Sequence, residues 1–213
     1  MIPSGIDVWV FDLDNTLYPA SDLYDEIGER MTAYIARTLG VDAALAVELR
    51  ERYFHQYGAT ITGLVKHHST DASDYLYDVH LADHSVLSAD TELRDLITRL
   101  PGRRIIHTNG GGGHAERVLE SLKLADLFDD IFDIGHAELV PKPQREAFDR
   151  LIARVSIDPR RSMLIEDTMR NLEPAFEMGF STALVGAVHP DPRPAYVQHW
   201  AHDVKDLLRG WLA

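Results

Sequence analysis

The sequence predicts an α/β protein in which a parallel sheet is interrupted, after its first strand, by a helical insert. Five short apolar segments are typical of buried strands, and after residue 100 they alternate with segments whose apolar residues have helical spacing. Strands that are apolar on both faces need helices on both sides of the sheet. The predicted strands are Val8–Phe11, Arg104–His107, Asp130–Ile134, Met163–Ile165 and Thr182–Val185.

Residues 18–88 contain helical patterns and no convincing strand. We therefore expect a helical domain of residues 18–88, inserted into a core made of residues 1–17 and 89–213. The predicted helices of the insert are Asp22–Leu39, Ala43–Gln56, Thr60–His67 and Ala72–His80. Those of the core are Leu87–Leu100, Ala115–Leu122, Gln144–Val155, Met169–Met178 and Tyr196–Ala213.

The chain has 213 residues, a net charge of −13 and no cysteine. The missing cysteines exclude disulfides, thiolate metal sites and a cysteine nucleophile. The negative charge argues against a nucleic-acid polymer or a membrane as partner, although a local cation can still hold a small phosphorylated metabolite. The N-terminal residues show no targeting signal, so we expect a cytoplasmic protein. Both a monomer and a homodimer are open.

Polar side chains follow four of the predicted strands. Because the carboxyl ends of parallel strands meet at one edge of a sheet, we expect these side chains to lie together. Taken singly, most of them are equally typical of turns, helix caps or solvated surface. Their joint occurrence at four strand ends favours a common site. The residues are Asp12, Asp14, Thr108, Asn109, Lys142, Glu166 and Asp167.

This set of residues suits phosphoryl transfer. Mg²⁺ prefers oxygen ligands, which Asp12 and Asp167 supply, with Glu166 close by. One carboxylate can attack phosphorus, while a second gives a proton to the leaving oxygen and later takes one from water. A phosphate also needs hydrogen-bond donors and positive charge. The candidates for that task are Thr108, Asn109 and Lys142.

The motifs DLDNTLY, HTN, KP and IEDTMRN occur in the order that is typical of the haloacid dehalogenase (HAD) superfamily, which the chain resembles over residues 7–186. The resemblance implies a Rossmann-like core with a C1 cap that closes over the site. It implies that Asp12 is the nucleophile, and that Asp14 is the general acid and base whose backbone carbonyl also binds Mg²⁺. The other implied roles are phosphate binding by Thr108 and Lys142 and metal binding by Asp167 and Glu166.

The acid at position 14 favours a phosphatase over a dehalogenase. A halide leaving group needs no proton, and relatives that break carbon–halogen bonds lack this acid. Asp14 is present here. The resemblance therefore implies a Mg²⁺-dependent phosphomonoester hydrolase with an aspartyl-phosphate intermediate.

The stretches YFHQYGATITGLVKHH and LPGRRIIHTNG resemble pyrimidine 5′-nucleotidase-like members of the superfamily. This resemblance implies UMP or CMP as substrate, with Tyr57, Thr60 and His67 as contacts to the base or sugar. Packing inside the cap is the alternative role of Tyr57. A different small phosphate ester, such as phosphoglycolate or a sugar phosphate, is a second hypothesis for the substrate. A third hypothesis is that the chain has a HAD fold but acts as a non-catalytic binding module.

Two local features stand apart from these motifs. The run Gly110–Gly113 occupies positions where relatives carry polar or basic residues, and we expect a mobile loop that weakens substrate contacts. His80 and His84 have the i,i+4 spacing of a metal-binding pair. No third ligand is evident in the sequence, so we assign no second metal site.

Overall fold

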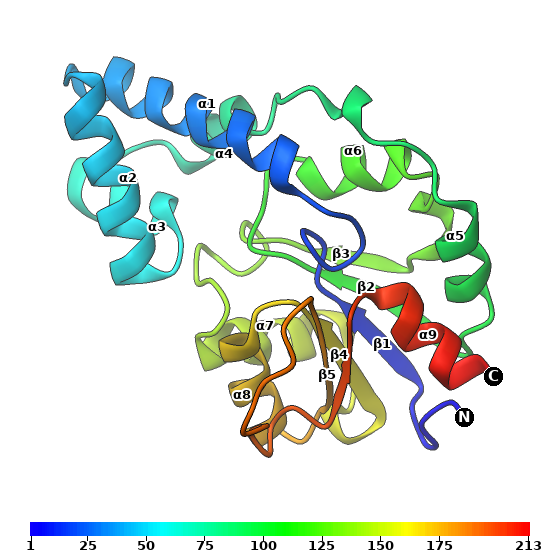
Figure 1. The fold of residues 1–213 in the computed structure, drawn as a ribbon. Helices are drawn as coiled ribbons and strands as arrows, with labels where there is room; N and C mark the ends of the chain where they lie inside the picture. The colour runs from blue at the N-terminus through cyan, green and yellow to red at the C-terminus, as the bar shows by residue number, and fades with distance from the viewer.

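The computed structural model describes residues 1–213 and contains a six-stranded sheet, which confirms the predicted α/β fold. The strand order is β3-β2-β1-β4-β5-β6, so the first strand of the chain lies near the middle of the sheet (Figure 1). All five neighbouring pairs are parallel. The strands are β1 (Val8–Phe11), β2 (Arg103–His107), β3 (Asp130–Phe132), β4 (Ser162–Glu166), β5 (Ser181–Val185) and β6 (His199–Ala201).

Helices cover both faces of the sheet, as continuous apolar strands require. Helices α5, α6 and α9 pack on one face in a cluster of 29 buried apolar residues. Helices α7 and α8 pack on the other face in a cluster of 15. Alternate residues of β1 point to the two faces, so Trp9 and Phe11 lie in the first cluster and Val10 in the second. The helices are α5 (Thr91–Thr98), α6 (His114–Ser121), α7 (Arg145–Val155), α8 (Met169–Glu177) and α9 (Val204–Leu212).

The prediction of one closing helix over Tyr196–Ala213 is wrong. The segment begins with a short strand, β6, and helix α9 starts only at Val204, after Asp203 caps it. The hydroxyl of Thr182 in β5 donates to the carbonyl of Tyr196 at 2.7 Å and fixes the approach of the new strand. Three half-buried residues are too few to show an alternating pattern, so only pairing with β5 defines this strand.

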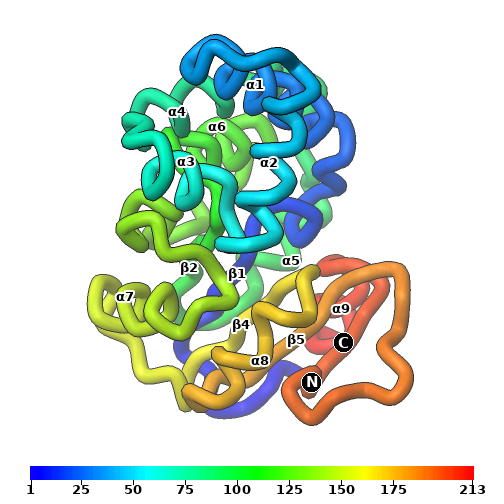
Figure 2. Tube along the Cα trace, turned by 90° about the vertical axis from the view of Figure 1, so that its left-hand side faces the viewer, coloured from blue at the N-terminus to red at the C-terminus, as the bar shows by residue number.

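The first four of the five α-helices between β1 and β2 form a lobe beside the sheet (Figures 1 and 2). The lobe has its own cluster of 12 buried apolar residues, to which Tyr34, Leu49 and Tyr75 belong. Ile27 in the first half of α1 packs instead with the sheet, so α1 belongs to both clusters. The helices are α1 (Ser21–Leu39), α2 (Ala43–Tyr57), α3 (Thr60–His68) and α4 (Ala72–Val79), with a 3₁₀ turn at His84–Val86.

The helices are too short or too polar to cross a lipid bilayer.

Candidate active site

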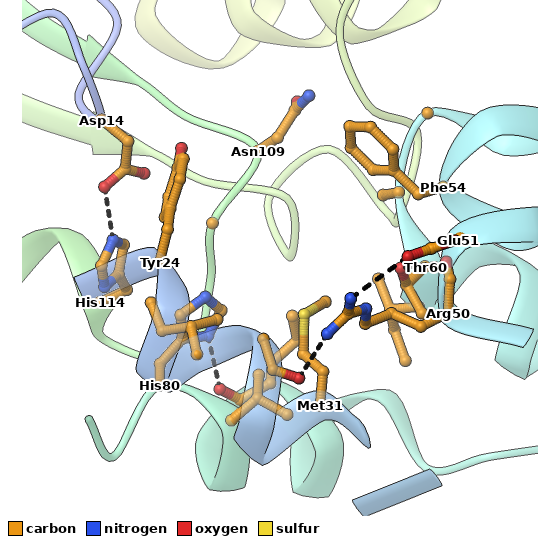
Figure 3. Close-up of a pocket in the computed structure, with 18 of the residues that line it drawn as sticks. Asp14, Tyr24, Met31, Arg50, Glu51, Phe54, Thr60, His80, Asn109 and His114 are labelled. Carbon is orange, nitrogen blue, oxygen red and sulfur yellow. Dashed lines mark hydrogen bonds and ion pairs between the residues drawn. The ribbon is translucent and has the colours of Figure 1, made fainter. Parts of the chain in front are cut away.

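The strand ends that were expected to share a site line one cavity of about 1090 Å³, bounded by the carboxyl edge of the sheet and by the helical insert. Asp12 follows β1, Thr108 follows β2 and Glu166 ends β4. Lys142 enters from the loop between β3 and α7. Figure 3 shows part of this cavity, with Asp14 on one side and residues of the insert on the other.

The ammonium group of Lys142 lies at the centre of a buried charge cluster. Its side chain is 1% exposed, and Nζ donates to Asp12 Oδ1 at 2.7 Å, to Glu166 Oε1 at 2.8 Å and to the carbonyl of His107 at 2.6 Å. Burial acts to lower the pKa of Lys142, but the two carboxylates outweigh it and hold that pKa above its ordinary value. The lysine therefore stays charged, and each of its three N–H groups has a partner.

The carboxyl group of Asp12 is fixed through both oxygens. Oδ1 accepts from Lys142, and Oδ2 accepts from the hydroxyl of Thr16 at 3.0 Å. Burial raises the pKa of Asp12; Lys142 acts against this shift, and the neighbouring Glu166 carboxylate adds to it. An oriented and poorly hydrated carboxylate has the properties of an activated nucleophile.

The side chain of Asn109 bonds to the backbone of the loop that carries Lys142. Its side-chain Nδ2 donates to the carbonyl of Lys142 at 3.1 Å, and its Oδ1 accepts from the backbone N–H of Lys142 at 2.8 Å. These two bonds tie Asn109 to the backbone of Lys142, and the second hydrogen on Nδ2 remains available as a donor. Thr108 is buried at the cavity wall, and its Oγ1 accepts from the N–H of Gly110 at 2.9 Å. Its hydroxyl hydrogen remains available as a donor.

Three carboxylates offer oxygen atoms that lie within 4.8 Å of one another: Asp12, Glu166 and Asp167. They differ in how much of their bonding capacity is free. Glu166 Oε1 accepts from Lys142 and, at 2.6 Å, from Asn171 Nδ2, while Oε2 accepts from the N–H of Thr168 at 2.6 Å. Within the protein, Asp167 accepts only from the Thr168 hydroxyl. Asp167 therefore has more lone pairs free for a metal ion, whereas the oxygens of Glu166 are largely bonded within the protein.

Asp14 lies beside this cluster and is 8% exposed. The hydroxyl of Tyr18 donates to its Oδ1, and so does Nε2 of His114 at 2.8 Å. Burial acts to raise the pKa of Asp14, but His114 and Tyr18 together outweigh it and hold that pKa below its ordinary value. The bonding of His114 to this acid has no signal in the sequence motifs.

The three residues expected from the insert are placed differently. Thr60 lines the cavity, but its hydroxyl donates to the carbonyl of Arg50 at 3.0 Å and ties α3 to α2. Tyr57 and His67 bond to each other at 2.6 Å and do not line the cavity. They belong to a group of aromatic rings from α2 and α3, in which His67 stacks on the buried Tyr53.

Other side chains of the insert face the cavity instead. Tyr24 of α1 and Phe54 of α2 line the cavity and are 45% and 46% exposed (Figure 3). Arg50 also lines it, with Nη1 donating to the carbonyl of Gly28 at 2.7 Å. The only indication in the sequence is that Phe54 is an aromatic residue that does not lie on the buried face of its helix.

The spacing of His80 and His84 has a different explanation from metal binding. Nδ1 of His80 donates to the carbonyl of Leu76 at 2.8 Å, so this nitrogen is occupied. The ring of His80 lies 4.7 Å from that of His114, and Nε2 of His84 lies 3.4 Å from Nδ1 of His114. Both histidines of the insert thus pack on a histidine of the core.

The run Gly110–Gly113 packs closely, which contradicts the expected loose loop. A Cβ on Gly110 would lie 2.9 Å from Cδ2 of His114, and one on Gly112 would lie 2.4 Å from the carbonyl oxygen of Leu76 in α4. The glycines are needed because the insert and His114 approach the backbone here.

Gly112→Ala is expected to lower the free energy of unfolding by about 2–4 kcal/mol, because it adds a clash with a backbone atom to a strained left-handed residue. Gly40→Ala is the matched control, since Gly40 has φ 65° against 62° at Gly112 and nothing within 4 Å of its Cβ position. We expect the control to lose about 1 kcal/mol in chemical denaturation. Equal losses in the two variants would contradict the packing role of Gly112.

Comparison with known proteins gives the same family as the motifs. The chain matches the haloacid dehalogenase-like hydrolase family over residues 6–179. It is 28% identical over 191 residues to phosphate metabolism protein 8 of Saccharomyces cerevisiae, covering 81% of this chain and 59% of that protein. A shorter match, 37% identical over 65 residues, covers 30% of this chain and 27% of the N-acetylmuramic acid 6-phosphate phosphatase of Pseudomonas aeruginosa. The chain thus spans less than two thirds of the length of each of these relatives.

Solved structures of a dehalogenase and of a phosphatase both share the fold of this chain. An L-2-haloacid dehalogenase of Xanthobacter autotrophicus superposes with a TM-score of 0.62 at 16% identity, covering 96% of this chain and 97% of that one. A HAD phosphatase of Thermococcus onnurineus superposes with a TM-score of 0.63 at 15% identity and the same coverage. Identities this low speak for the fold alone. Because the family match covers most of the sequence, however, the chain belongs to the haloacid dehalogenase-like hydrolases.

Proposed function

We propose that this hydrolase cleaves phosphate monoesters in two steps, through an aspartyl-phosphate on Asp12. The observation that carries the proposal is the joint placement of a buried, lysine-paired carboxylate and a second buried carboxylate on one cavity. Asp12 bonds to Lys142 at 2.7 Å, and Asp14 lines the same cavity. A binding module has no use for the second acid, and a dehalogenase has no proton to transfer to its leaving group.

In the first step an oxygen of Asp12 attacks phosphorus, a new O–P bond forms, and the ester O–P bond breaks. The leaving oxygen takes a proton from Asp14, whose pKa must rise when the anionic phosphate binds beside it for the carboxyl group to carry that proton. In the second step Asp14, now ionised, takes a proton from water, the water oxygen attacks phosphorus, and the bond to Asp12 breaks to release phosphate. The charge of Lys142 and the hydroxyl of Thr108 stabilise the phosphoryl oxygens.

The donor set suits Mg²⁺, because three carboxylates bring oxygens within 4.8 Å of one another. Asp12 and Asp167 would hold the ion with the backbone carbonyl of Asp14, while Glu166 adds charge and orients Lys142. When bound, Mg²⁺ supplies positive charge that lets the anionic nucleophile approach an anionic phosphate.

Chelation with EDTA is expected to abolish phosphate release, and added Mg²⁺ is expected to restore it. Binding is also expected to show without turnover, as a rise in melting temperature with Mg²⁺ that Asp167→Asn removes. Asp206→Asn is the control, since Asp206 belongs to an exposed cluster with His202 and Asp203, apart from the cavity. Turnover that survives the chelator, or equal Mg²⁺ stabilisation of both variants, would refute the assignment.

For the substrate we propose a pyrimidine nucleoside 5′-monophosphate, UMP or CMP, with residues 18–88 as the cap that selects it. The cavity supports a ligand with a flat ring, because two half-exposed aromatic side chains, Tyr24 and Phe54, line its insert side. Bases stack on such rings. These two residues take the role first expected of Tyr57 and His67, while Thr60 shapes the wall.

Phosphoglycolate or a sugar phosphate is the competing substrate class. A panel of UMP, CMP, AMP, GMP, phosphoglycolate and sugar phosphates, assayed for phosphate release with Mg²⁺, separates the two. If a base stacks on Phe54, Phe54→Ala is expected to raise KM for UMP about tenfold and to leave KM for phosphoglycolate unchanged. Tyr77→Ala, at an exposed aromatic residue that does not line the cavity, is the control. Highest activity on a ligand without a base would discard the nucleotide assignment.

A further inference from the structure

One buried histidine of the core bonds directly to the second carboxylate of the site. His114 is 1% exposed, and its Nε2 lies 2.8 Å from Oδ1 of Asp14. A carboxylate only accepts, so Nε2 carries the hydrogen. The hydroxyl of Tyr18 donates to the same oxygen. Both protein donors to Asp14 therefore converge on Oδ1, and Oδ2 receives none.

Because both donors bond to Oδ1, the two oxygens of Asp14 differ in their ability to transfer a proton. A carboxyl group that delivers a proton needs one oxygen free to carry it and to face the leaving group. Rotation about the Cβ–Cγ bond would otherwise exchange the two oxygens. Two donors on Oδ1 oppose this rotation and leave Oδ2 as the oxygen that exchanges the proton.

His114 is itself held by the helical insert. The ring of His80 lies 4.7 Å from the His114 ring, and Nε2 of His84 lies 3.4 Å from its Nδ1. On the core side, Gly110 leaves room for the ring, since a Cβ there would lie 2.9 Å from Cδ2. The orientation of His114 is thus set jointly by the core and by the insert.

The side chain of Arg117 links the end of α4 in the insert to the core. Nη2 of Arg117 in α6 donates to the carbonyl of His80 at 3.0 Å and to that of Gly112 at 2.9 Å. Gly112 in turn touches α4 at Leu76. The end of α4 and the glycine run therefore form one packed unit around His114.

We propose that His114 is a positioning residue that orients Asp14 for proton transfer, and that His84 of the insert holds His114 in place. The proposal rests on the proposed phosphatase function and extends it, because it couples the docked position of the insert to the proton-transfer step. In the first step, His114 keeps Oδ2 of Asp14 directed at the leaving oxygen, which takes the proton as the ester O–P bond breaks.

The test compares leaving groups that differ in their need for a proton. An alkoxide must be protonated as it leaves, whereas the phenolate of p-nitrophenyl phosphate leaves without a proton. The parameter is kcat/KM, because it covers only the steps up to departure of the leaving group. The alkyl substrate is whichever monophosphate of the panel the unmodified protein turns over best.

His114→Leu is expected to lower kcat/KM about 100-fold for the alkyl ester and less than about threefold for p-nitrophenyl phosphate. His114→Gln keeps an N–H at a similar reach and is expected to recover most of the alkyl activity. His84→Leu is expected to show the same selectivity with a smaller loss. Val118→Ala, at a fully buried position one turn further along α6, is the control for loss of packing and is expected to lower both substrates equally.

Each result decides the proposal. Selective loss on the alkyl ester with rescue by glutamine supports it. Equal loss on both substrates in His114→Leu, or failure of glutamine to rescue, overturns the positioning role. An unselective His84→Leu overturns the part assigned to the insert. Phosphate release from neither substrate by the unmodified protein refutes the proposed function itself, which is distinct from all three outcomes.

Discussion

Asp12→Asn is expected to lower kcat for phosphate release by at least about four orders of magnitude while the protein stays folded. An amide oxygen is too weak a nucleophile to open the ester, whereas the carboxylate of Asp12 is fixed by Lys142 at 2.7 Å and by Thr16 at 3.0 Å. Asparagine has nearly the same shape, so the cavity is expected to remain formed.

The measurement is phosphate release with Mg²⁺, together with acid quenching to trap a phosphorylated protein. The unmodified protein is expected to yield an acid-quenched acyl phosphate, and the variant none. Asp149→Asn, at an exposed position of α7, is the control for a carboxylate-to-amide change. Substantial turnover by Asp12→Asn would mean that another group, or water, attacks phosphorus.

Lys142→Met is expected to abolish activity and also to lower the free energy of unfolding by about 3–5 kcal/mol. Removal of the ammonium group leaves Asp12 and Glu166, both buried, without the cation that each contacts within 2.8 Å. Uncompensated buried charge is among the most costly defects that a substitution can create.

The sign of the pH dependence checks the cause of this loss. Without Lys142, the pKa of both carboxyl groups rises in the folded state. For each carboxyl group, the folded state then binds more protons than the unfolded state at any pH between the unfolded-state pKa and the raised folded-state pKa. The free energy of unfolding therefore falls as pH rises through that interval. The loss in Lys142→Met is therefore expected to be larger at pH 8 than at pH 5, as measured by denaturation in EDTA.

A second variant separates charge from packing. Adding Glu166→Gln to Lys142→Met removes one of the two unpaired charges and is expected to recover part of the lost stability without recovering activity. A loss that is independent of pH and unchanged in the double variant would assign it to the missing aliphatic chain instead. Lys142 would then be a packing residue first and a charged one second.

Much of the site could be predicted because the edge of a parallel sheet collects whatever follows its strands. The apolar run before Asp12 and the run before Glu166 each mark where a strand ends, and strand pairing then brings these ends together. Lys142 follows from the same rule with a short loop added. The placement of Asp12 and Lys142 at one edge of the sheet can therefore be predicted from local pattern and chain order.

The partner of each polar group could not be predicted in this way. The sequence suggests Asn109 as a phosphate ligand but gives no sign of its two bonds to the backbone of Lys142, 33 positions away. His114 directly precedes the predicted helix Ala115–Leu122, and nothing in the sequence indicates that it bonds to Asp14, 100 positions away. Such contacts depend on how loops from different strands fold onto each other, which periodicity does not encode.

The sequence by itself determined the α/β class, the helical insert after the first strand and the set of acids and cation at the strand ends. Those features follow from local spacing of apolar residues, which decides what each segment can bury. The tertiary structure alone decided that Phe54 faces the cavity while Tyr57 and His67 do not, and that the glycine run receives the insert. These depend on the angle at which the insert packs on the core, which is set by side chains far apart in the sequence.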